Sequence, residues 1–255
     1  MRSLPPLDMH AHIDVTIAAT ELEDLRSVIF AVTRSLQEAR QAVGRRDGTT
    51  VWGVGCHPGV ARAQRDFSPE HFADIMESTA FVGEVGLDGK SRVPMAKQRD
   101  TFRAALEVLT TMPRLVSLHS YAATEALIED LETSPIRGAI LHWWLGDAAL
   151  TARAVDLGCY FSVNASSVRK TELMALIPSD RLLTETDHPF GDRRSKGLSA
   201  PGFLDGVERS VARLHAISAA DARWLTWRNL SRLVREVGCS QLLPRQVRSW
   251  LAVTA

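Results

Sequence analysis

Eight short apolar runs alternate with amphipathic segments along the 255-residue chain. The runs lie at residues 6–10, 27–32, 50–55, 80–84, 114–118, 138–142, 159–163 and 181–185. After the fourth run, Phe102, Ala105, Leu106 and Leu109 recur at the spacing of one helical face. Strand followed by helix, repeated, predicts a parallel α/β fold, and a closed barrel needs eight such strands in about 250 residues. We therefore predict a (β/α)8 TIM barrel that forms a single domain over residues 1–255.

Two helix starts are marked by capping residues. Ser68 precedes Pro69, and serine at the N-cap followed by proline at the first helical position is a favoured beginning. Ser218 with Asp221 three residues later resembles a capping box in which Asp replaces the usual Glu. Both pairs predict a helix that begins at the next residue.

The sequence of the turn after the first predicted strand distinguishes between two possible folds, a closed barrel and an open dinucleotide-binding sheet. Such a sheet usually carries a glycine-rich turn at this point. Here residues 10–14 read His-Ala-His-Ile-Asp, with two imidazoles and no glycine. This turn suits a metal ion better than a pyrophosphate.

Composition and charge describe an ordinary globular chain. Hydrophobic residues make up 45% and charged residues 24%, which argues against a disordered or fibrous protein. The 30 basic residues balance 30 acidic ones, so nothing global indicates nucleic-acid binding, although a local basic patch is compatible with neutrality. No apolar stretch has the length of a signal peptide near the first residue or of a membrane span of roughly 20 residues. We expect a soluble cytoplasmic protein with no membrane partner.

The 3 cysteines are odd in number and far apart, which does not fit a disulfide framework or a paired zinc-binding site. Cys56 and Cys159 lie within apolar runs. We expect both to be small buried hydrophobic residues.

Residues able to bind a metal follow several of the apolar runs. They are His10, His12, Glu84, His119, His142 and Asp187. All but His12, which we place on the turn after the first strand, lie at or just after the end of a predicted strand. A (β/α)8 barrel brings its strand ends together on one face, so these distant residues can share one centre. Imidazole and carboxylate together suit zinc, manganese, cobalt or nickel, and a carboxylate-rich site also holds magnesium.

Each histidine taken alone has a structural alternative. His10 and His12 would share one face of a regular strand as ligands, or would be surface or capping histidines. His119 and His142 could each be a hydrogen-bonded core histidine, but these separate alternatives are hard to sustain jointly. Asp8 is expected to accept backbone hydrogen bonds or to orient a histidine.

Two carboxylates, Glu84 and Asp187, carry the predicted catalytic roles. Glu84 interrupts an apolar run, and a buried carboxylate needs a cation or several hydrogen bonds; a salt bridge is the alternative. A glutamate between two ions can bridge them in a two-metal hydrolase. Asp187 can bind one ion and also accept a proton from the water that the ion acidifies. Glu185 could compete for either role, although an ion pair inside the barrel or at its rim is favoured for it.

Several motifs together resemble the TatD family of metal-dependent deoxyribonucleases. They are Asp8-Met9-His10-Ala11-His12, Gly55-Cys56-His57-Pro58, Val82-Gly83-Glu84-Val85-Gly86-Leu87-Asp88, His142-Trp143-Trp144-Leu145-Gly146 and Glu185-Thr186-Asp187-His188-Pro189. The resemblance runs nearly the whole chain, down to Asn229 in what we expect to be the final helix. The segments 84–89, 159–164 and 183–187 are most similar to the QatD branch, which is associated with the Qat anti-phage system.

This resemblance implies a (β/α)8 barrel with one or two divalent ions, Mg2+, Mn2+ or Zn2+. The implied ligands are His10, His12, Glu84 and Asp187 for the first ion, and Glu84, His119 and His142 for the second. The implied activity is hydrolysis of DNA phosphodiesters, often from the 3′ end, on DNA ends or single strands. The branch implies protein partners in a multi-component defence system.

The chain departs from the family pattern where a phosphate would be gripped. His119-Ser120-Tyr121 stands where many members have His-x-Arg, so a phenol replaces a guanidinium. The common Asn-Glu-Pro segment is reduced to Ser199-Ala200-Pro201. Arg193 and Arg194, in the basic run just past Asp187, would contact phosphate or form a solvated face.

Other side chains on the same rim are candidate substrate contacts. His57, after the third run, would contact substrate or hold a structural hydrogen bond. Tyr121, Trp143 and Trp144 could stack on bases, whereas core packing is favoured for the tryptophans. The predicted substrate-binding set is His57, Tyr121, Arg193 and Arg194.

Three functions are compatible with these residues. The first is a divalent-metal-dependent nuclease acting on DNA ends or single strands. The second keeps the metals but hydrolyses a small phosphoester or amide, because related barrels act on such bonds. The third is a metal-bearing scaffold subunit of a defence complex.

Overall fold

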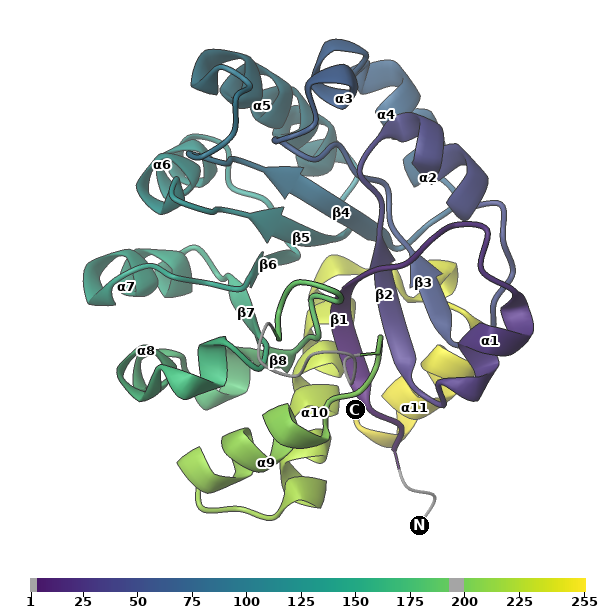
Figure 1. Ribbon diagram of the computed structural model, residues 1–255, viewed down its shortest axis with the longest axis vertical. Helices are drawn as coiled ribbons and strands as arrows, with labels where there is room; N and C mark the ends of the chain where they lie inside the picture. Colours follow the sequence, from purple (N-terminus) through teal and green to yellow (C-terminus); the bar gives the residue numbers. More distant parts are fainter. Residues whose placement is uncertain (1–3, 193–199) are drawn as a thin grey trace.

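Eight parallel strands surround the centre of the molecule, and helices cover their outer side (Figure 1). This computed structural model describes residues 4–192 and 200–255. The strands are β1 (Leu7–His12), β2 (Val28–Val32), β3 (Thr50–Trp52), β4 (Phe81–Gly86), β5 (Leu115–His119), β6 (Ala139–His142), β7 (Tyr160–Val163) and β8 (Leu182–Thr184). Each of the eight predicted runs overlaps one strand, and β1, β4 and β5 extend past the ends of their runs, so the predicted order of elements is confirmed.

Two bridges join a three-stranded and a five-stranded sheet into a closed barrel. The sheets have the orders β1-β2-β3 and β4-β5-β6-β7-β8, and every neighbouring pair is parallel. Val54, just after β3, bridges Val82 of β4, and Ala11 of β1 bridges His188, which follows β8. Because all the strands are parallel, their carboxyl ends meet at one end of the barrel. The predicted TIM barrel is confirmed.

Most helices alternate with the strands. They are α1 (Ala19–Asp24), α2 (Leu36–Ala42), α3 (Ala61–Arg65), α4 (Pro69–Met76), α5 (Met95–Thr111), α6 (Thr124–Thr133), α7 (Ala148–Asp156), α8 (Thr171–Leu176), α9 (Asp205–Leu214), α10 (Ala219–Val237) and α11 (Arg245–Val253), with short 3-10 helices η1 (Ser167–Arg169), η2 (Ser179–Arg181) and η3 (Ser240–Leu242). Ser68 and Ser218 accept hydrogen bonds from the backbone N–H groups of His71 and Asp221, so both predicted N-caps are confirmed. Among the described helices, none combines the length and the hydropathy that crossing a bilayer requires.

Helices α10 and α11 close the amino-terminal end of the barrel. Trp227 and Leu230 of α10 pack in one buried cluster with strand residues such as Leu7 and Leu115. Asn229 donates hydrogen bonds of 2.8 Å to the carbonyl oxygens of Ser179 and Leu182, and so fixes α10 to the start of β8. Asn229 therefore lies in α10, and the expectation that it belongs to the final helix is wrong, because α11 follows. With this end filled, the carboxyl end of the barrel is left for a site.

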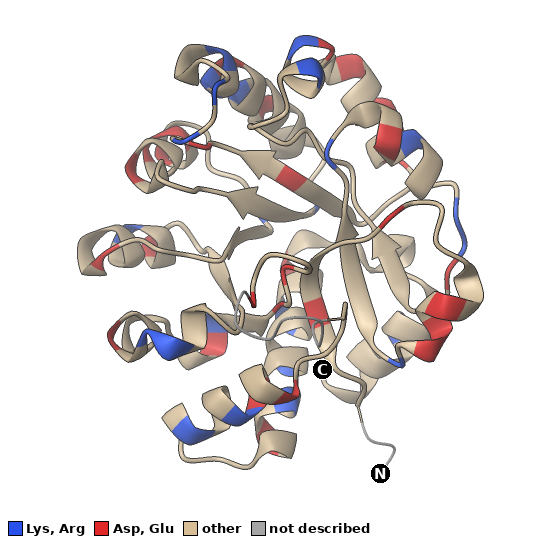
Figure 2. Ribbon diagram, in the orientation of Figure 1, with Lys and Arg blue, Asp and Glu red and all other residues tan. Residues whose placement is uncertain are grey.

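Charged residues are concentrated on the helices and loops (Figure 2). Within the eight described strands, Asp8 and Glu84 are the only Asp, Glu, Lys or Arg residues. Both are buried. Because a buried carboxylate requires a cation or several hydrogen bonds, these two residues point to the part of the barrel that carries chemistry.

Candidate metal centre

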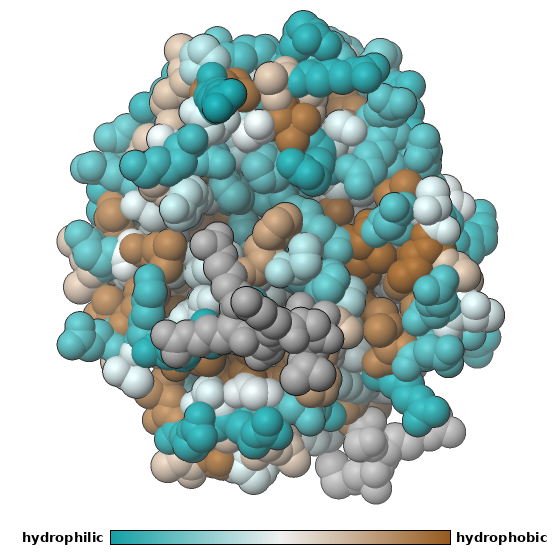
Figure 3. Space-filling view, in the orientation of Figure 1, coloured by the Kyte–Doolittle hydropathy of each residue, from teal (hydrophilic) through white to brown (hydrophobic). Residues whose placement is uncertain are grey.

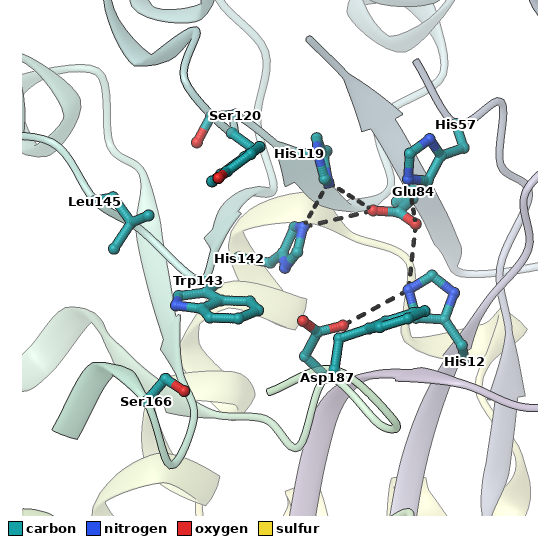
Figure 4. A pocket seen from close by; sticks show the side chains of 12 residues that line it. His12, His57, Glu84, His119, Ser120, His142, Trp143, Leu145, Ser166 and Asp187 are labelled. Atoms are coloured by element: carbon teal, nitrogen blue, oxygen red, sulfur yellow. Dashed lines mark hydrogen bonds and ion pairs between the residues drawn. The ribbon is translucent and has the colours of Figure 1, made fainter. Parts of the chain in front are cut away.

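A cavity of about 460 Å³ opens at the carboxyl ends of the strands. Its lining residues are His12, His57, Glu84, His119, Ser120, Tyr121, His142, Trp143, Leu145, Ser166, Asp187 and Phe190. Figure 4 shows Glu84 with His119 and His142 on one side and His12 on the other. His10, the sixth predicted ligand, is fully buried and stacks on His142 with ring centroids 3.9 Å apart. The structure thus brings all six predicted ligands together.

His10, His12 and Asp187 form one compact group. His10 Nε2 lies 3.4 Å from His12 Nε2, and Asp187 Oδ1 lies 3.7 Å from the first nitrogen and 3.6 Å from the second. Two ligand atoms that share one zinc ion at about 2.0–2.2 Å are at most about 4.4 Å apart. These three atoms therefore fit a single divalent ion.

Strand β1 directs both of its histidines toward Asp187. Its pairing with β2 shifts register between Asp8 and Ala11 and then continues to His12, which pairs with Val32. The expectation that His12 lies on a turn is therefore wrong, because the backbone ladder extends past the apolar part of the run. His10 Nδ1 lies 2.7 Å from Ser117 Oγ of β5, a contact that leaves Nε2 toward the cavity.

Asp187 and the buried Asp8 fix the loop that follows β8. Asp187 has a left-handed φ of 45°, and its N–H donates to the carbonyl of His10 at 2.8 Å. The Asp8 carboxylate accepts hydrogen bonds from the N–H groups of Thr186 and Gly202, each at 2.8 Å, and from the Thr186 hydroxyl at 2.6 Å. A residue with a side chain keeps such a φ only where its surroundings impose it. The predicted backbone role of Asp8 is confirmed.

The two oxygens of Glu84 face different histidines. Its Oε2 lies 3.0 Å from His119 Nδ1 and 3.5 Å from His142 Nε2, and these two nitrogens are 3.1 Å apart. Its Oε1 lies 3.3 Å from His12 Nε2 and 3.5 Å from His57 Nε2. This is the arrangement of a carboxylate that can bridge two cations.

The Oε1 atom of Glu84 supplies a direct test of whether these residues fit a metal. It is buried and has no hydrogen-bond partner among the described residues. A buried acceptor left without a partner costs about 1–3 kcal/mol, and more when it is charged. A divalent ion beside this oxygen would remove that cost, and the imidazole and carboxylate donors around it are those that such ions prefer.

The electrostatics of the cluster keep Glu84 charged. Burial alone would raise the pKa of Glu84, but the facing imidazoles of His57, His119 and His142 outweigh burial and hold this pKa well below its usual value. Burial and the neighbouring carboxylates Glu185 and Glu84 raise the pKa of Asp187 well above its usual value, against the opposing charge of His142. A bound cation would oppose the rise at Asp187. The cluster thus contains one firmly ionised carboxylate and one with a high proton affinity.

Glu185 is a buried carboxylate that lies next to His142. It is fully buried and accepts hydrogen bonds from the hydroxyl of Ser162, the side-chain amide of Asn164 at 3.0 Å and the N–H of Trp143 at 3.1 Å. Its Oε1 lies 3.8 Å from His142 Nδ1, in agreement with the expected ion pair inside the barrel. Although it could form a third group of ligands with His10 and His142, its oxygens are already occupied by three donors. We therefore assign it to orienting His142.

His57 makes the structural hydrogen bond that was one of its two alternatives, and its ring also lines the cavity, where contact with substrate stays a prediction. Its Nδ1 accepts a hydrogen bond of 2.8 Å from the N–H of Gly59, while Nε2 faces Glu84. Burial lowers the pKa of His57 to about 4, so the ring is neutral near pH 7. A neutral imidazole that accepts at Nδ1 carries its proton at Nε2. His57 therefore presents an N–H donor to the cavity.

Gly55 allows the chain after β3 to pass close to Glu84. A Cβ atom at this position would overlap the carbonyl oxygen of Thr33 and would lie 2.7 Å from the backbone nitrogen of Glu84. The neighbouring N–H of Cys56 donates to the carbonyl of Glu84 at 2.9 Å. Residue 55 must therefore lack a side chain for Glu84 to hold this place.

The predicted substrate contacts have different outcomes. Tyr121 is exposed on the cavity wall, and Trp143 also lines the cavity. Trp144 is buried and donates from Nε1 to Thr151 Oγ1 at 2.9 Å, so core packing is confirmed for this tryptophan. Arg193 and Arg194 lie outside the described residues.

Two residues at the rim were not anticipated from the sequence. Phe190 lines the cavity just after the His-Pro pair. Arg34 follows β2, its side chain is exposed, and its carbonyl accepts a hydrogen bond of 3.1 Å from the N–H of His57. Burial is the main cause that lowers the pKa values of His12 and His57, and the charge of Arg34 adds to it in both. A lone arginine after an apolar run gives no local signal of this proximity.

Comparison with known proteins identifies the family. The sequence profile described as "TatD related DNase" matches residues 7–235. This chain belongs to the TatD-related DNase family. The resemblance of its motifs to the TatD family is thereby confirmed, and membership makes the protein a metal-dependent hydrolase of this family.

Relatives and solved structures agree with this membership. The metal-dependent hydrolase YabD of Bacillus subtilis is 26% identical over 89% of this chain and 98% of its own length. The 3′-5′ ssDNA/RNA exonuclease TatD of Edwardsiella piscicida is 31% identical over 68% of this chain and 72% of its own length. The structure of YjjV, a TatD homologue from Escherichia coli, superposes with a TM-score of 0.79 at 20% identity, covering 89% of this chain and 96% of that one. A TatD-family hydrolase from Entamoeba histolytica gives 0.75 at 14% identity, with 91% and 99% covered. These two likenesses establish the shared fold.

Proposed function

We propose that this protein is a divalent-metal-dependent nuclease that hydrolyses DNA phosphodiester bonds, as an exonuclease on single strands or DNA ends. The observation that carries the proposal is Glu84, whose Oε1 faces His12 and His57 while its Oε2 faces His119 and His142. Relatives named 3′-5′ ssDNA/RNA exonuclease support a nucleic-acid substrate. Residues 1–255 would form one hydrolase domain. The three cysteines are free and buried, which supports a reducing compartment such as the cytoplasm.

Six side chains would hold the ions. His10, His12, Glu84 and Asp187 would bind one ion, and Glu84, His119 and His142 the other, with Mg2+, Mn2+ or Zn2+ as the candidates. Bound there, the ions would polarise the scissile phosphate and acidify an attacking water. Glu84 contributes a full negative charge to both groups because its pKa is held low.

Asp187 is the proposed proton acceptor and His57 a proposed phosphate donor. The Asp187 carboxylate lines the cavity beside His10 and His12, where it could accept a proton from the attacking water. The Nε2–H group of His57 would donate a hydrogen bond to a phosphate oxygen, which is an acceptor. Tyr121 would contact the substrate from the opposite wall.

Cationic contacts to the phosphate would come from outside the cavity lining. We include Arg193 and Arg194 in this role from their sequence position. Among the described residues, Arg34 directly follows β2, and its backbone lies next to His57. Its guanidinium has no hydrogen bond or ion pair to another described residue. An exposed guanidinium at this rim is suited to phosphate.

Changing Arg34 to Ala should weaken single-strand binding at every sequence. If its guanidinium neutralises one phosphate, the slope of log affinity against log salt should become shallower by about 0.7. Affinity titrations at several salt concentrations measure this slope. Arg40→Ala, an exposed arginine on α2, is the matched control and should change neither quantity. An unchanged slope in Arg34→Ala would remove Arg34 from the phosphate contacts.

A second candidate function is hydrolysis of a small phosphoester or amide. It is favoured by one observation, that no Lys or Arg is among the described residues lining the cavity. A third candidate follows from the segments similar to the QatD branch, which support a place in a multi-component defence system with protein partners. In that setting the protein would be a nuclease subunit or a metal-bearing scaffold.

A substrate panel separates these candidates. Purified protein with Mg2+, Mn2+ or Zn2+ would be given 5′-labelled single-stranded DNA, duplex DNA, RNA, a small phosphodiester and an amide. We expect single strands to shorten progressively, and Glu84→Gln to be inactive on all substrates. Turnover of the small ester or amide without strand cleavage would support the second candidate. Bound metal without turnover of any substrate would support the scaffold.

A further inference from the structure

Part of the cavity lining is apolar although it faces solvent. Tyr121, Leu145 and Phe190 line the cavity and are 53%, 36% and 48% exposed. Three of the eight exposed large hydrophobic side chains among the described residues therefore border this one cavity. Single exposed apolar residues are ordinary, whereas a cluster of them beside a cavity marks a binding surface. With Trp143, these residues form what we call the apolar wall.

The residues of the apolar wall flank the ligand-type residues on two sides. Figure 4 shows Trp143 and Leu145 across the cavity from His12 and His57. The Phe190 ring meets the His12 ring edge to face, with centroids 5.3 Å apart, and its N–H donates to the carbonyl of Asp187 at 2.6 Å. A group held by this wall would therefore lie beside any bond that reacts at the metal centre.

The backbone keeps Trp143 at the cavity. Trp143 has a left-handed φ of 41°, and its N–H donates to the buried Glu185 at 3.1 Å. A tryptophan holds such a conformation only where the surrounding structure imposes it, and this occurs most often at functional sites. The same Glu185 orients His142, so the wall and the metal centre share one support.

The cavity has a polar part and an apolar part, as a nucleotide does. Its inner part carries carboxylates and imidazoles, while its wall offers aromatic and aliphatic surface. Figure 3, in the orientation of Figure 1, shows hydrophobic side chains beside hydrophilic ones near the middle of the view. A nucleotide likewise joins an anionic phosphate to a flat base whose faces stack on aromatic side chains. A volume of about 460 Å³ suits one such unit rather than a duplex.

We propose that the apolar wall of Tyr121, Trp143, Leu145 and Phe190 binds the unpaired base of the nucleotide at the end of a strand. This inference rests on the proposed nuclease function and specifies its substrate. A base inside a duplex is stacked and paired, so its faces are not available to the wall. The wall thereby selects single-stranded ends, and it requires a base but not a particular one.

Two strands that differ by one base test the proposal. They are identical except that the terminal nucleotide of one is abasic, and a second pair carries the change at the other end. Affinity is measured by fluorescence anisotropy on chelator-treated protein, where strands stay intact, and hydrolysis is measured after metal is restored. The wild-type protein should prefer the intact strand by about 5- to 100-fold for one of the two ends.

Leu145→Ser with Phe190→Ala should reduce this preference to nearly one. The matched control is Leu176→Ser with Phe203→Ala, whose side chains are 39% and 60% exposed and do not line the cavity. The control should keep the wild-type preference. Leu145→Ser alone is the second variant, because a serine at an exposed position leaves folding intact, and it should lower the preference partly.

The outcomes for the wall and for the nuclease function are distinguishable. Equal binding of abasic and intact strands by the wild type, or an unchanged preference in the wall variants, would overturn the proposal that the apolar wall binds a base. Base-dependent binding without hydrolysis under any ion would overturn the nuclease function and leave the wall standing. Hydrolysis of abasic and intact ends at equal rates would retain the function and reject the wall.

Discussion

Glu84→Gln is expected to lose bound divalent metal and to lower the rate of hydrolysis by about 1000-fold or more, because a metal ion contributes several kcal/mol to such reactions. The substitution preserves the size of the side chain but removes the charge that faces both groups of histidines. An amide is a poor ligand for an ion that needs a carboxylate on each side. Metal content measured by mass spectrometry and single-turnover hydrolysis on the same preparation check both parts.

Glu208→Gln is the matched control for this prediction. Glu208 is also buried, but it pairs with Arg223 away from the cavity, with Arg223 Nε 2.7 Å from Oε1. Its substitution should lower stability and leave metal content and rate per folded molecule unchanged. Equal metal content and equal rate in Glu84→Gln and wild type would contradict the assignment of Glu84.

Asp187→Asn is expected to slow hydrolysis by about 100- to 10,000-fold, the range attributed to general acid–base catalysis. Asparagine tolerates the left-handed φ of 45° at this position, so the loop after β8 should keep its conformation. Because His119, His142 and Glu84 are untouched, at least part of the metal should remain bound. The variant therefore separates loss of the proton acceptor from loss of the whole centre.

The measurement is the single-turnover rate at saturating metal, with metal content determined in parallel. Asp180→Asn serves as the control, since Asp180 is exposed and pairs with Arg232 at 3.0 Å outside the cavity. It should behave as wild type. A rate for Asp187→Asn within a few-fold of the wild-type rate would rule out Asp187 as the proton acceptor.

The barrel could be predicted because its strands are buried and read as continuous apolar runs. The six ligand-type residues stood out because polar groups that follow such runs at strand ends are costly to bury without a purpose. The same reliance on apolar runs led to the wrong placement of His12 on a turn. The apolar pattern of the first run stops before it, whereas the ladder between β1 and β2 continues to His12 and Val32.

Relations between strands could not be predicted. No local pattern shows that His57 faces Glu84, that three donors occupy Glu185, or that Arg34 lies beside His57. Each of these depends on the distance between segments far apart in sequence. The exposure of a side chain also could not be predicted from the sequence. The adjacent residues Trp143 and Trp144 look alike in sequence, although Trp143 lines the cavity and Trp144 lies in the core.

The most direct test of the metal-dependent nuclease is a metal titration. Protein stripped of metal by a chelator would receive Mg2+, Mn2+ or Zn2+ in steps while the shortening of an end-labelled single strand is followed. The account predicts no shortening of the strand by the stripped protein and recovery of activity that saturates as one or two ions bind per chain. Full activity of the stripped protein, or saturated metal binding without strand shortening under any ion, would contradict it.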